Sequence, residues 1–523
     1  MMGWEVSSYV YGGQSYTASS AEEYTALAKA LEGAAAEWRA ASISWGAASL
    51  QLAQQCAGMT MCPASVAGLA GVPVSGHATL PYSQLIRRFS DHAAACGAIA
   101  ATIDEMASLL IRAHSLYAKS ELWTRRLFTE LMQLITTVRP KEASLAMGIL
   151  AAGGILGGSM MDGKFAPSYG SAITAPLQEG YLSGIAPYIG TIDPARPQQV
   201  DPLTGLLRTD EVNGAAGAIS QYSQPADGLR QGTLHVTEVF TDVPVVGASS
   251  SVAQALEQLR RLAEERLGKV DLDSGLSYAT IAVQRYRRDD GSPAWLVTIP
   301  GTDGKPDSPF GWPQNVELMS DDPAQRIKAD SAMMVLEAMR QAGIGKDDPV
   351  ALIGHSQGGI TAAAIAADMS EEYTIEHVVT AGSPVANHPI PPSTWVTSIE
   401  IGDELVAALD GAANPATDTW LTVHGYAYPT GASSTGEVGP NGECAPGDAT
   451  SSWNRGYRGA EVAGASDGKE LTHWLKYHQA AYQNATDLGS LAVANHERHF
   501  RQVIEGELEE TRYFQGRMSH DNE

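Results

Sequence analysis

The sequence has few cysteines, and their spacing excludes two kinds of small-domain scaffold. Four cysteines, at positions 56, 62, 96 and 444, are spread over 523 residues. They are too few and too scattered for a disulfide framework or a four-thiolate zinc site. Cys56 and Cys62 are close enough along the chain to form one disulfide, with Cys96 as a partner for either. Unpaired thiols that pack as small hydrophobic side chains are the alternative.

Positive charge is also scarce. Lys and Arg number 34 against 59 Asp and Glu, which gives a formal net charge of −25. Because nucleic-acid binding requires clustered cations that displace counterions from phosphates, we expect no nucleic-acid partner. The first ten residues lack the basic-then-apolar pattern of a cleavable signal peptide and include Glu5. The general secretory route is therefore not indicated.

A chain of this length, 44% hydrophobic, can bury more than one core. The sequence pattern divides it into three parts. We expect an all-α helical hairpin over residues 1–140, a glycine-rich apolar segment and irregular linker over 141–230, and an α/β domain with a C-terminal helix over 231–523.

The hairpin is predicted from two stripes of apolar residues in which steps of three and four alternate. One runs from Tyr24 to Leu52 and the other from Tyr82 to Tyr117. Between them, residues 58–80 contain several prolines and glycines, which indicate a connecting loop. Two such stripes expose more apolar surface than two helices can cover, so we expect a third helical element or a small helical partner protein.

Residues 143–161 contain no charged side chain. Their length approaches that of a bilayer crossing, which predicts a membrane contact. The glycine pairs at 153–154 and 157–158 lower the hydropathy and favour close helix packing, so a buried or flexible connector is the alternative. Residues 162–230 show no sustained period, and we expect irregular linker and surface loops there.

From residue 231 the pattern alternates between short apolar strands and helices, which predicts a mainly parallel sheet covered on both faces. The expected strands are 234–240, 278–286, 295–299, 350–353, 377–380, 395–401 and 420–423, with helices near 250–267, 323–342 and 357–369. Ligands of such sheets bind at the carboxyl ends of the strands.

Residues 349–369 read as a buried strand, a glycine-hinged turn that carries Ser356, and a helix of small residues. This is the pattern of a nucleophile elbow, in which Gly354 and Gly358 let the strand and the helix approach each other closely. Ser356 is therefore the predicted nucleophile.

A serine nucleophile requires a histidine base and a carboxylate that orients it, in the chain order Ser, Asp, His. Asp403 follows the predicted strand 395–401 and is the preferred acid, with Asp410 as the alternative. His473 and His478 each begin a His-x-x-x-Tyr pattern. We prefer His478, because it precedes a predicted helix, and keep His473 as the alternative.

Two preorganised N–H donors are needed for the oxyanion that develops during acyl transfer. The residue after the nucleophile, Gln357, offers one. Thr302, in the Pro-Gly-Thr segment after strand 295–299, offers the other. We expect no metal and no cofactor, since His496 and His499 lack the i, i+4 spacing of a helical zinc pair.

Taken in order, five motifs make residues 233–485 resemble α/β-hydrolases of the broad class 3 lipase-like group found in actinobacteria. They are Pro-Gly-Thr at 300–302, Gly-His-Ser-Gln-Gly at 354–358, Ala-Gly-Ser-Pro at 381–384, Gly-Asp-Glu-Leu-Val with Leu-Asp-Gly at 402–411, and the late His-x-x-x-Tyr. The resemblance implies a serine esterase that cleaves lipid or other acyl esters. Ile-Pro-Gly-Thr here replaces the Phe-Arg-Gly-Thr of many relatives, so substrate preference does not transfer.

The N-terminal hairpin resembles substrates of type VII secretion systems, which carry a Tyr-x-x-x-Asp/Glu export signal. Tyr117 and Glu121 have that spacing at the end of the second stripe, whereas the Trp-x-Gly turn of those substrates is missing. The resemblance implies a secreted or cell-envelope protein that contacts the secretion machinery, with a cytoplasmic location as the alternative. For the whole chain, the alternatives to an esterase are a non-catalytic protein on a hydrolase scaffold and an acyltransferase or peptidase.

Overall fold

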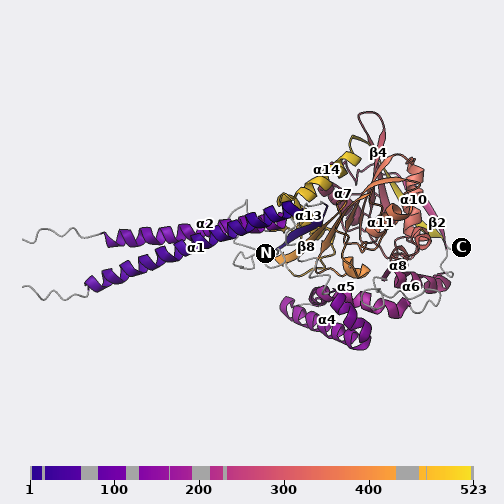
Figure 1. Cartoon of the computed structure of the whole chain (residues 1–523). Coiled ribbons are helices and arrows are strands. Elements are labelled where there is room, and N and C mark those ends of the chain that lie inside the picture. Colours follow the sequence, from indigo (N-terminus) through magenta and orange to yellow (C-terminus); the bar gives the residue numbers. More distant parts are fainter. Residues whose placement is uncertain are drawn as a thin grey trace, which may run out of the picture. The chain divides into compact units, whose positions relative to one another are not determined.

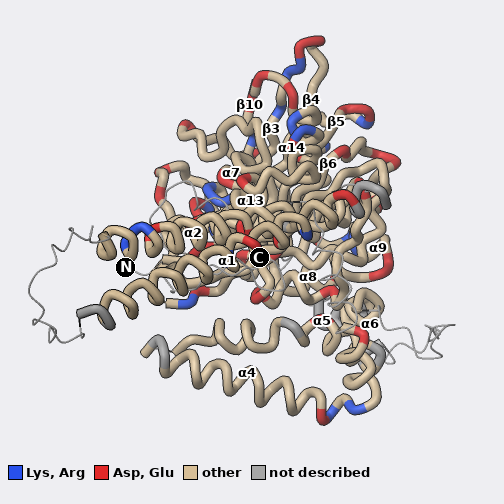
Figure 2. Tube along the Cα trace, turned by 60° about the vertical axis from the view of Figure 1, so that its left-hand side comes forward, with Lys and Arg blue, Asp and Glu red and all other residues tan. Residues whose placement is uncertain are grey.

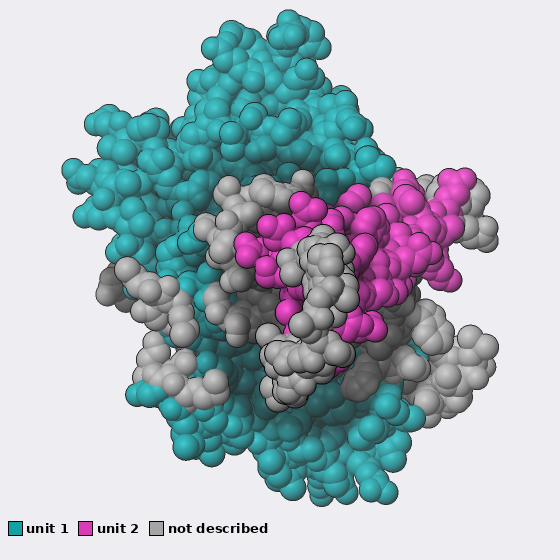
Figure 3. All heavy atoms as spheres, turned by 90° about the vertical axis from the view of Figure 1, so that its left-hand side faces the viewer, with its two compact units in different colours: residues 1–15, 117–523 teal, residues 16–116 magenta. Residues whose placement is uncertain are grey.

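The structure is a computed structural model of the 523-residue chain. It describes residues 3–13, 18–60, 81–113, 129–163, 165–190, 212–227, 232–430, 459–466 and 468–519. The chain forms two compact units. One combines residues 1–15 with 117–523, and the other is Tyr16–Leu116 (teal and magenta in Figure 3).

A ten-stranded sheet with the order β2-β10-β3-β4-β5-β6-β7-β8-β1-β9 is the centre of the larger unit (Figure 1). The middle strands are parallel, as the alternating pattern predicted. They are β4 (Pro293–Ile299), β5 (Pro349–His355), β6 (Thr374–Ala381), β7 (Trp395–Ile401) and β8 (Trp420–Pro429). The outer strands are antiparallel to their neighbours: β1 (Trp4–Gly12), β2 (Thr233–Val239), β3 (Thr280–Arg287), β9 (Ala460–Glu461) and β10 (Glu507–Ser519).

Helices cover both faces of the sheet, and each face has its own apolar core. One face is covered by α7 (Val252–Glu265), α13 (Leu475–Asp487) and α14 (Leu491–Val503). The other is covered by α10 (Asp330–Ala342) and α11 (Gln357–Asp368), against which α8 (Trp312–Leu318) and α9 (Pro323–Lys328) pack. The strands between them are almost fully buried, which is why they appear in the sequence as continuous apolar runs.

The first strand corrects the predicted boundary of the N-terminal domain at residue 140. β1 pairs with β8 in the sheet, so residues 16–116 are an insertion in the larger unit. The segment carries two neighbouring serines, Ser7 and Ser8. Both are buried, and the backbone N–H and hydroxyl of Ser8 donate to Oδ1 of Asn484 at 2.8 and 3.0 Å. The predicted C-terminal helix, α14, is followed by a further strand, β10, between β2 and β3.

The expected irregular linker is also corrected, because two helices lie within it. They are α5 (Ser168–Gly190) and α6 (Val212–Asp227), while α4 (Pro140–Asp162) contains the charge-free segment. Glycines hid these helices in the sequence and make their packing close. A Cβ on Gly158 would lie 2.0 Å from the Tyr169 ring, and one on Gly154 would lie 2.6 Å from its carbonyl oxygen. Figure 2 shows the charges of α4 near its N-terminal end and none along its middle.

The smaller unit contains the predicted antiparallel hairpin of α1 (Ala18–Thr60) and α2 (Tyr82–Ala113). Its buried interface includes small residues, and Trp45 of α1 packs against Phe89 and His92 of α2, with ring centroids 5.0 and 5.2 Å apart. Ala28, Ala35 and Ser49 of α1 are buried, and the Ser49 hydroxyl donates to Ile86 O at 3.1 Å. Leu27, Trp38 and Trp45 remain 49%, 40% and 38% exposed. Residues 61–80 of the expected loop, together with Tyr117 and Glu121, lie outside the described residues.

Candidate active site

Ser356 stands in the tight turn between β5 and α11. Its φ of 55° and ψ of −124° are unfavourable for a residue with a side chain. The turn depends on two glycines that the motif identified. A Cβ on Gly354 would lie 2.2 Å from the Gly358 backbone, and one on Gly358 would lie 2.0 Å from Ile299 O. The geometry is therefore that of a nucleophile elbow at the carboxyl end of a central parallel strand.

A carboxylate after β7 contacts two histidines, and it belongs to Glu404. Its side chain is fully buried. Oε2 accepts a hydrogen bond from Nδ1 of His473 at 2.8 Å, and Oε1 accepts from Nε2 of His478 at 3.2 Å and from Ile401 N at 3.1 Å. Burial acts to raise the pKa of Glu404, but the attraction and hydrogen bonds of both histidines outweigh it and lower the pKa. Glu404 is thus held as a carboxylate.

The two candidate histidines differ in which ring nitrogen is available. His478, the sequence-based choice, is fully buried, with Nε2 against Glu404 and Nδ1 3.3 Å from Trp474 O. His473, the alternative, is 23% exposed and uses only Nδ1. None of the hydrogen bonds among the described residues uses its Nε2, and His473 lines the same cavity as Ser356. Only His473 therefore has a nitrogen available to take the serine proton.

The two predicted aspartates make other contacts. Asp403 lies next to Glu404 in the chain, but its Oδ2 accepts a hydrogen bond from Nζ of Lys469 at 2.6 Å. Asp410 accepts from Ala386 N at 2.9 Å, and burial holds its pKa well above the ordinary value. Neither carboxylate is hydrogen-bonded to a histidine in the described structure. We therefore correct the predicted acid: the carboxylate in the position that orients His473 is that of Glu404.

Sequence reasoning missed two residues that position this group. His355 precedes the nucleophile, and its Nε2 donates to His473 O at 2.8 Å. Burial, together with the neighbouring histidines, holds its pKa well below the ordinary value, so it acts as a neutral donor. Gly382 has a φ of +58°, and a Cβ there would lie 2.8 Å from Glu404, His473 and His478. The Ala-Gly-Ser-Pro motif was the signal for this residue, since only glycine leaves room for the three side chains.

The predicted oxyanion donors lie in two segments close to Ser356. A Cβ on Gly301 would lie 2.9 Å from Ser356 Cβ, so the loop after β4 reaches the nucleophile. The Thr302 hydroxyl lies 3.4 Å from Gln357 Oε1 and accepts from Nδ2 of Asn315 at 3.2 Å. No hydrogen bond among the described residues uses the backbone N–H of Thr302 or of Gln357. Both remain available to an oxyanion.

Ser356 and His473 line a cavity of about 940 Å³ within the larger unit. One wall is apolar and comes from α5, α6, α8 and the short 3₁₀ helix Ala407–Asp410. The other comes from α7 with the residues just after it and from residues 463–476 around the start of α13, and it carries charged side chains. The apolar wall includes Leu182, Ile185, Ala186, Val212, Ala215, Ala216, Val316, Met319 and Leu409, and the charged wall includes Arg260, Glu264, Lys269, Glu470 and Lys476.

Glu404, His473 and His478 also have the donor types of a zinc site. Among the residues that the structure describes, they form a group whose ligand atoms lie within 4.8 Å of one another. Their contacts are hydrogen bonds from ring nitrogens to a carboxylate, and a metal ion would have to replace both of them. The strained serine beside this group fits acyl transfer better than metal binding.

Comparison with known proteins supports the class of the fold. Residues 246–391 match a family model described as Alpha/beta hydrolase. This range contains α7, β3 to β6, the Gly301–Thr302 loop and the Ser356 elbow, while Glu404 and His473 lie beyond it. No curated protein and no solved structure gives a significant match. The larger unit therefore contains an α/β-hydrolase domain with a mixed sheet whose core strands are parallel, and this fold class suggests a hydrolase.

Proposed function

We propose that this protein is a serine esterase that cleaves acyl esters through a Ser356–His473–Glu404 triad. The observation that carries the proposal is the Glu404–His473 hydrogen bond in the cavity of a strained Ser356. The sequence-based triad used Asp403 and His478 instead. It is replaced because Asp403 is bound to Lys469, while both ring nitrogens of His478 are engaged.

The proposed reaction follows from these positions. His473 Nε2 takes the proton of Ser356 Oγ as the oxygen attacks the ester carbonyl carbon. Glu404 holds Nδ1–H and stabilises the imidazolium that forms. The N–H groups of Thr302 and Gln357 bind the oxyanion, and His473 then returns the proton to the leaving alcohol. Water attacks the acyl-enzyme by the same steps in reverse order and releases the acid.

The two walls of the cavity support an amphiphilic substrate. The apolar wall under α5 and α6 fits an acyl chain, because its lining side chains offer no polar partner. The charged wall fits a polar alcohol or head group. This is consistent with the lipase-like resemblance and favours a lipid or other long-chain acyl ester. Peptide cleavage and acyl transfer remain alternatives, because the triad defines acyl chemistry and not the acceptor.

A fluorophosphonate probe and a panel of p-nitrophenyl esters of graded chain length test the proposal. The intact protein should be labelled and active, and Ser356→Ala should be neither. Ester hydrolysis that survives Ser356→Ala would refute it. Loss of activity on treatment with a chelator, with recovery by Zn²⁺, would assign Glu404, His473 and His478 to a metal instead.

For the smaller unit, we propose a role in type VII-like export or in binding a small helical partner. The exposed Leu27 and Trp38 support it, since 49% and 40% of these large apolar side chains remain uncovered in the hairpin. A secreted or cell-envelope location follows from that role. Tyr117→Ala or Glu121→Ala should block export without lowering esterase activity in the lysate. Normal export of both variants would contradict the secretion role.

We also propose that α4 contacts a membrane. Two helices, Tyr82–Ile111 and Pro140–Met160, are long and apolar enough to cross one by length and composition. In α4, Leu145, Ile149 and Leu156 are 66%, 63% and 68% exposed. Packing of Gly154 and Gly158 against Tyr169 of α5 favours a helix that lies on the membrane over one that spans it.

A further inference from the structure

The guanidinium of Arg266 lies beneath the loop that carries the proposed oxyanion donor Thr302. Arg266 is the C-cap residue directly after α7, and its side chain is 1% exposed. Burial lowers its pKa to about 10, which leaves it a cation at neutral pH. A buried cation is costly unless charged and polar groups surround it, so its partners show what it holds in place.

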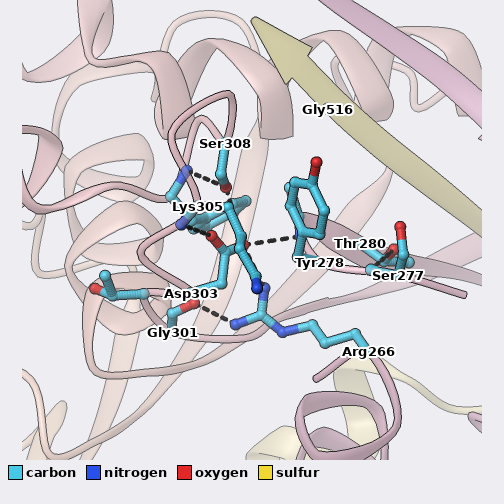
Figure 4. A network of polar contacts seen from close by, with 12 residues as sticks. Arg266, Ser277, Tyr278, Thr280, Gly301, Asp303, Lys305, Ser308 and Gly516 are labelled. Carbon is cyan, nitrogen blue, oxygen red and sulfur yellow. Dashed lines mark hydrogen bonds and ion pairs between the residues drawn. The ribbon is translucent and has the colours of Figure 1, made fainter. Parts of the chain in front are cut away.

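Those partners all belong to the loop after β4, as Figure 4 shows. Nη1 of Arg266 donates to Oδ2 of Asp303 at 3.2 Å, and Nη2 donates to the carbonyl oxygen of Gly301. Asp303 is itself fully buried and accepts from Ala279 N at 2.9 Å and from the Ser308 hydroxyl at 2.9 Å. The loop is therefore fixed at both Gly301 and Asp303.

The bond to Gly301 determines where the next N–H points. The peptide between Gly301 and Thr302 is planar and trans, so its C=O and N–H point in opposite directions. With the C=O directed at Arg266, the Thr302 N–H is directed away from it. Gly301 borders Ser356, and both Gly301 and Thr302 line the cavity. If this peptide turned over, a carbonyl oxygen would face the developing oxyanion and repel it.

We propose that Arg266 is a positioning residue that builds the oxyanion hole by fixing the peptide plane between Gly301 and Thr302. This inference rests on the proposed serine hydrolase function and goes beyond it, because it assigns a catalytic consequence to a side chain that is not a member of the triad.

The test compares Arg266 with a second buried arginine that has the same kinds of partners. Arg326 is 2% exposed, donates to both carboxylate oxygens of Asp368 at 2.7 and 2.6 Å, and donates to Ser320 O at 2.8 Å. It is not among the residues that line the Ser356 cavity. Arg266→Gln and Arg326→Gln should therefore both lower thermal stability, because each leaves a buried carboxylate without its cation.

Only Arg266→Gln should damage catalysis selectively. We expect kcat to fall roughly 100- to 1,000-fold, the range measured when one oxyanion donor is lost, with little change in KM. The inhibition constant of an alkylboronic acid, whose tetrahedral adduct uses the same donors, should rise in parallel with the loss of kcat/KM. Arg326→Gln should stay within about threefold of the wild type in both measurements, since it leaves the donors in place.

A second variant keeps the inference open to refutation if Arg266→Gln does not fold. Arg266→Lys retains the charge for Asp303 but cannot reproduce the two-pronged contact, so kcat should again fall while KM does not. If Arg266 variants keep the kcat and boronate affinity of Arg326→Gln, the inference is overturned while the hydrolase function stands. If Ser356→Ala is as active as the wild type, both fail together.

Discussion

Glu404 and His473 are joined by a 2.8 Å hydrogen bond, while the residue before Glu404 faces away to a lysine. Two adjacent carboxylates on one loop thus have different roles. Asp403 and Lys469 tie the loop to a neighbouring segment, and the Ser171 hydroxyl of α5 donates to Asp403 O at 3.2 Å. Helix α5, which lines the cavity, is therefore hydrogen-bonded directly to the loop that supplies the proposed catalytic acid.

This division of roles predicts different outcomes for the two carboxylates. Glu404→Gln should lower kcat by roughly 10³- to 10⁴-fold, because His473 loses the acceptor that orients Nδ1–H and stabilises the imidazolium. Asp403→Asn should retain kcat within a fewfold of the wild type. Steady-state kinetics on a p-nitrophenyl ester, with circular dichroism to verify folding, measures both. An inactive, folded Asp403→Asn with an active Glu404→Gln would return the acid role to Asp403.

Substitutions of the two histidines should likewise differ in their effect on kcat. His473→Ala should reduce kcat about 10⁴-fold or more, because no base then receives the Ser356 proton. His478→Gln should retain most of the wild-type kcat, because the glutamine amide can still donate to Glu404. Its thermal stability should fall. Fluorophosphonate labelling rates and thermal unfolding provide the measurements. The opposite pattern, with His478 essential and His473 dispensable, would support the sequence-based choice.

The apolar wall of the cavity should set the chain length of the acyl group. Leu182→Trp, on α5, should lower kcat/KM for dodecanoyl and longer esters by at least about tenfold, because the larger side chain fills space that the chain would use. Hydrolysis of acetyl and butyryl esters should change little. Ile173→Trp is the matched control, since Ile173 lies on the same helix, is 49% exposed and does not line the cavity. Equal loss for short and long esters would place the acyl chain elsewhere.

Buried His388 should make folding stability depend on pH. Burial and the nearby Arg326 lower its pKa from 6.5 to about 4, and Nε2 lies 3.0 Å from Leu318 O. Because the unfolded chain keeps the higher pKa, it binds more protons between pH 6.5 and 4, and stability is lost as the pH falls through that window. One such group contributes up to about 1.4 kcal/mol per pH unit.

His388→Gln should therefore flatten the fall in the free energy of unfolding between pH 6.5 and 4, measured by urea denaturation. The comparison of slopes isolates His388 from the other groups that titrate in the same range. An unchanged slope in the variant would show that His388 is not neutral in the folded protein.

How far the sequence could predict the site depended on whether each contact was local. The elbow was predictable because Gly354, Ser356 and Gly358 act within one turn, and the central strands were predictable because burial on both faces leaves apolar runs. The role of Glu404 in place of Asp403 was not predictable, because it depends on the directions of side chains in a loop. Glu404 turns back to Ile401 N, and that turn brings it to histidines far along the chain.

The first strand was missed for a related reason. Polar Ser8 is buried, and its burial is possible because Asn484, 476 residues further along the chain, supplies the hydrogen-bond acceptor. The helices α5 and α6 were missed because their glycines and small residues indicate loops in isolation. In the structure, these glycines allow close packing because they have no Cβ. At Gly184, for example, a Cβ would lie 2.5 Å from Thr136.

The position of β10 has a consequence for how the protein is made. It lies between β2 and β3, yet residues 507–519 leave the ribosome long after those two strands. Until they emerge, β2 has no partner strand and β3 has one open edge. Unpaired strand edges are the sites at which nascent chains pair with one another. Chaperone protection should therefore be needed until synthesis of β10, and a chain released before that point would be prone to aggregate.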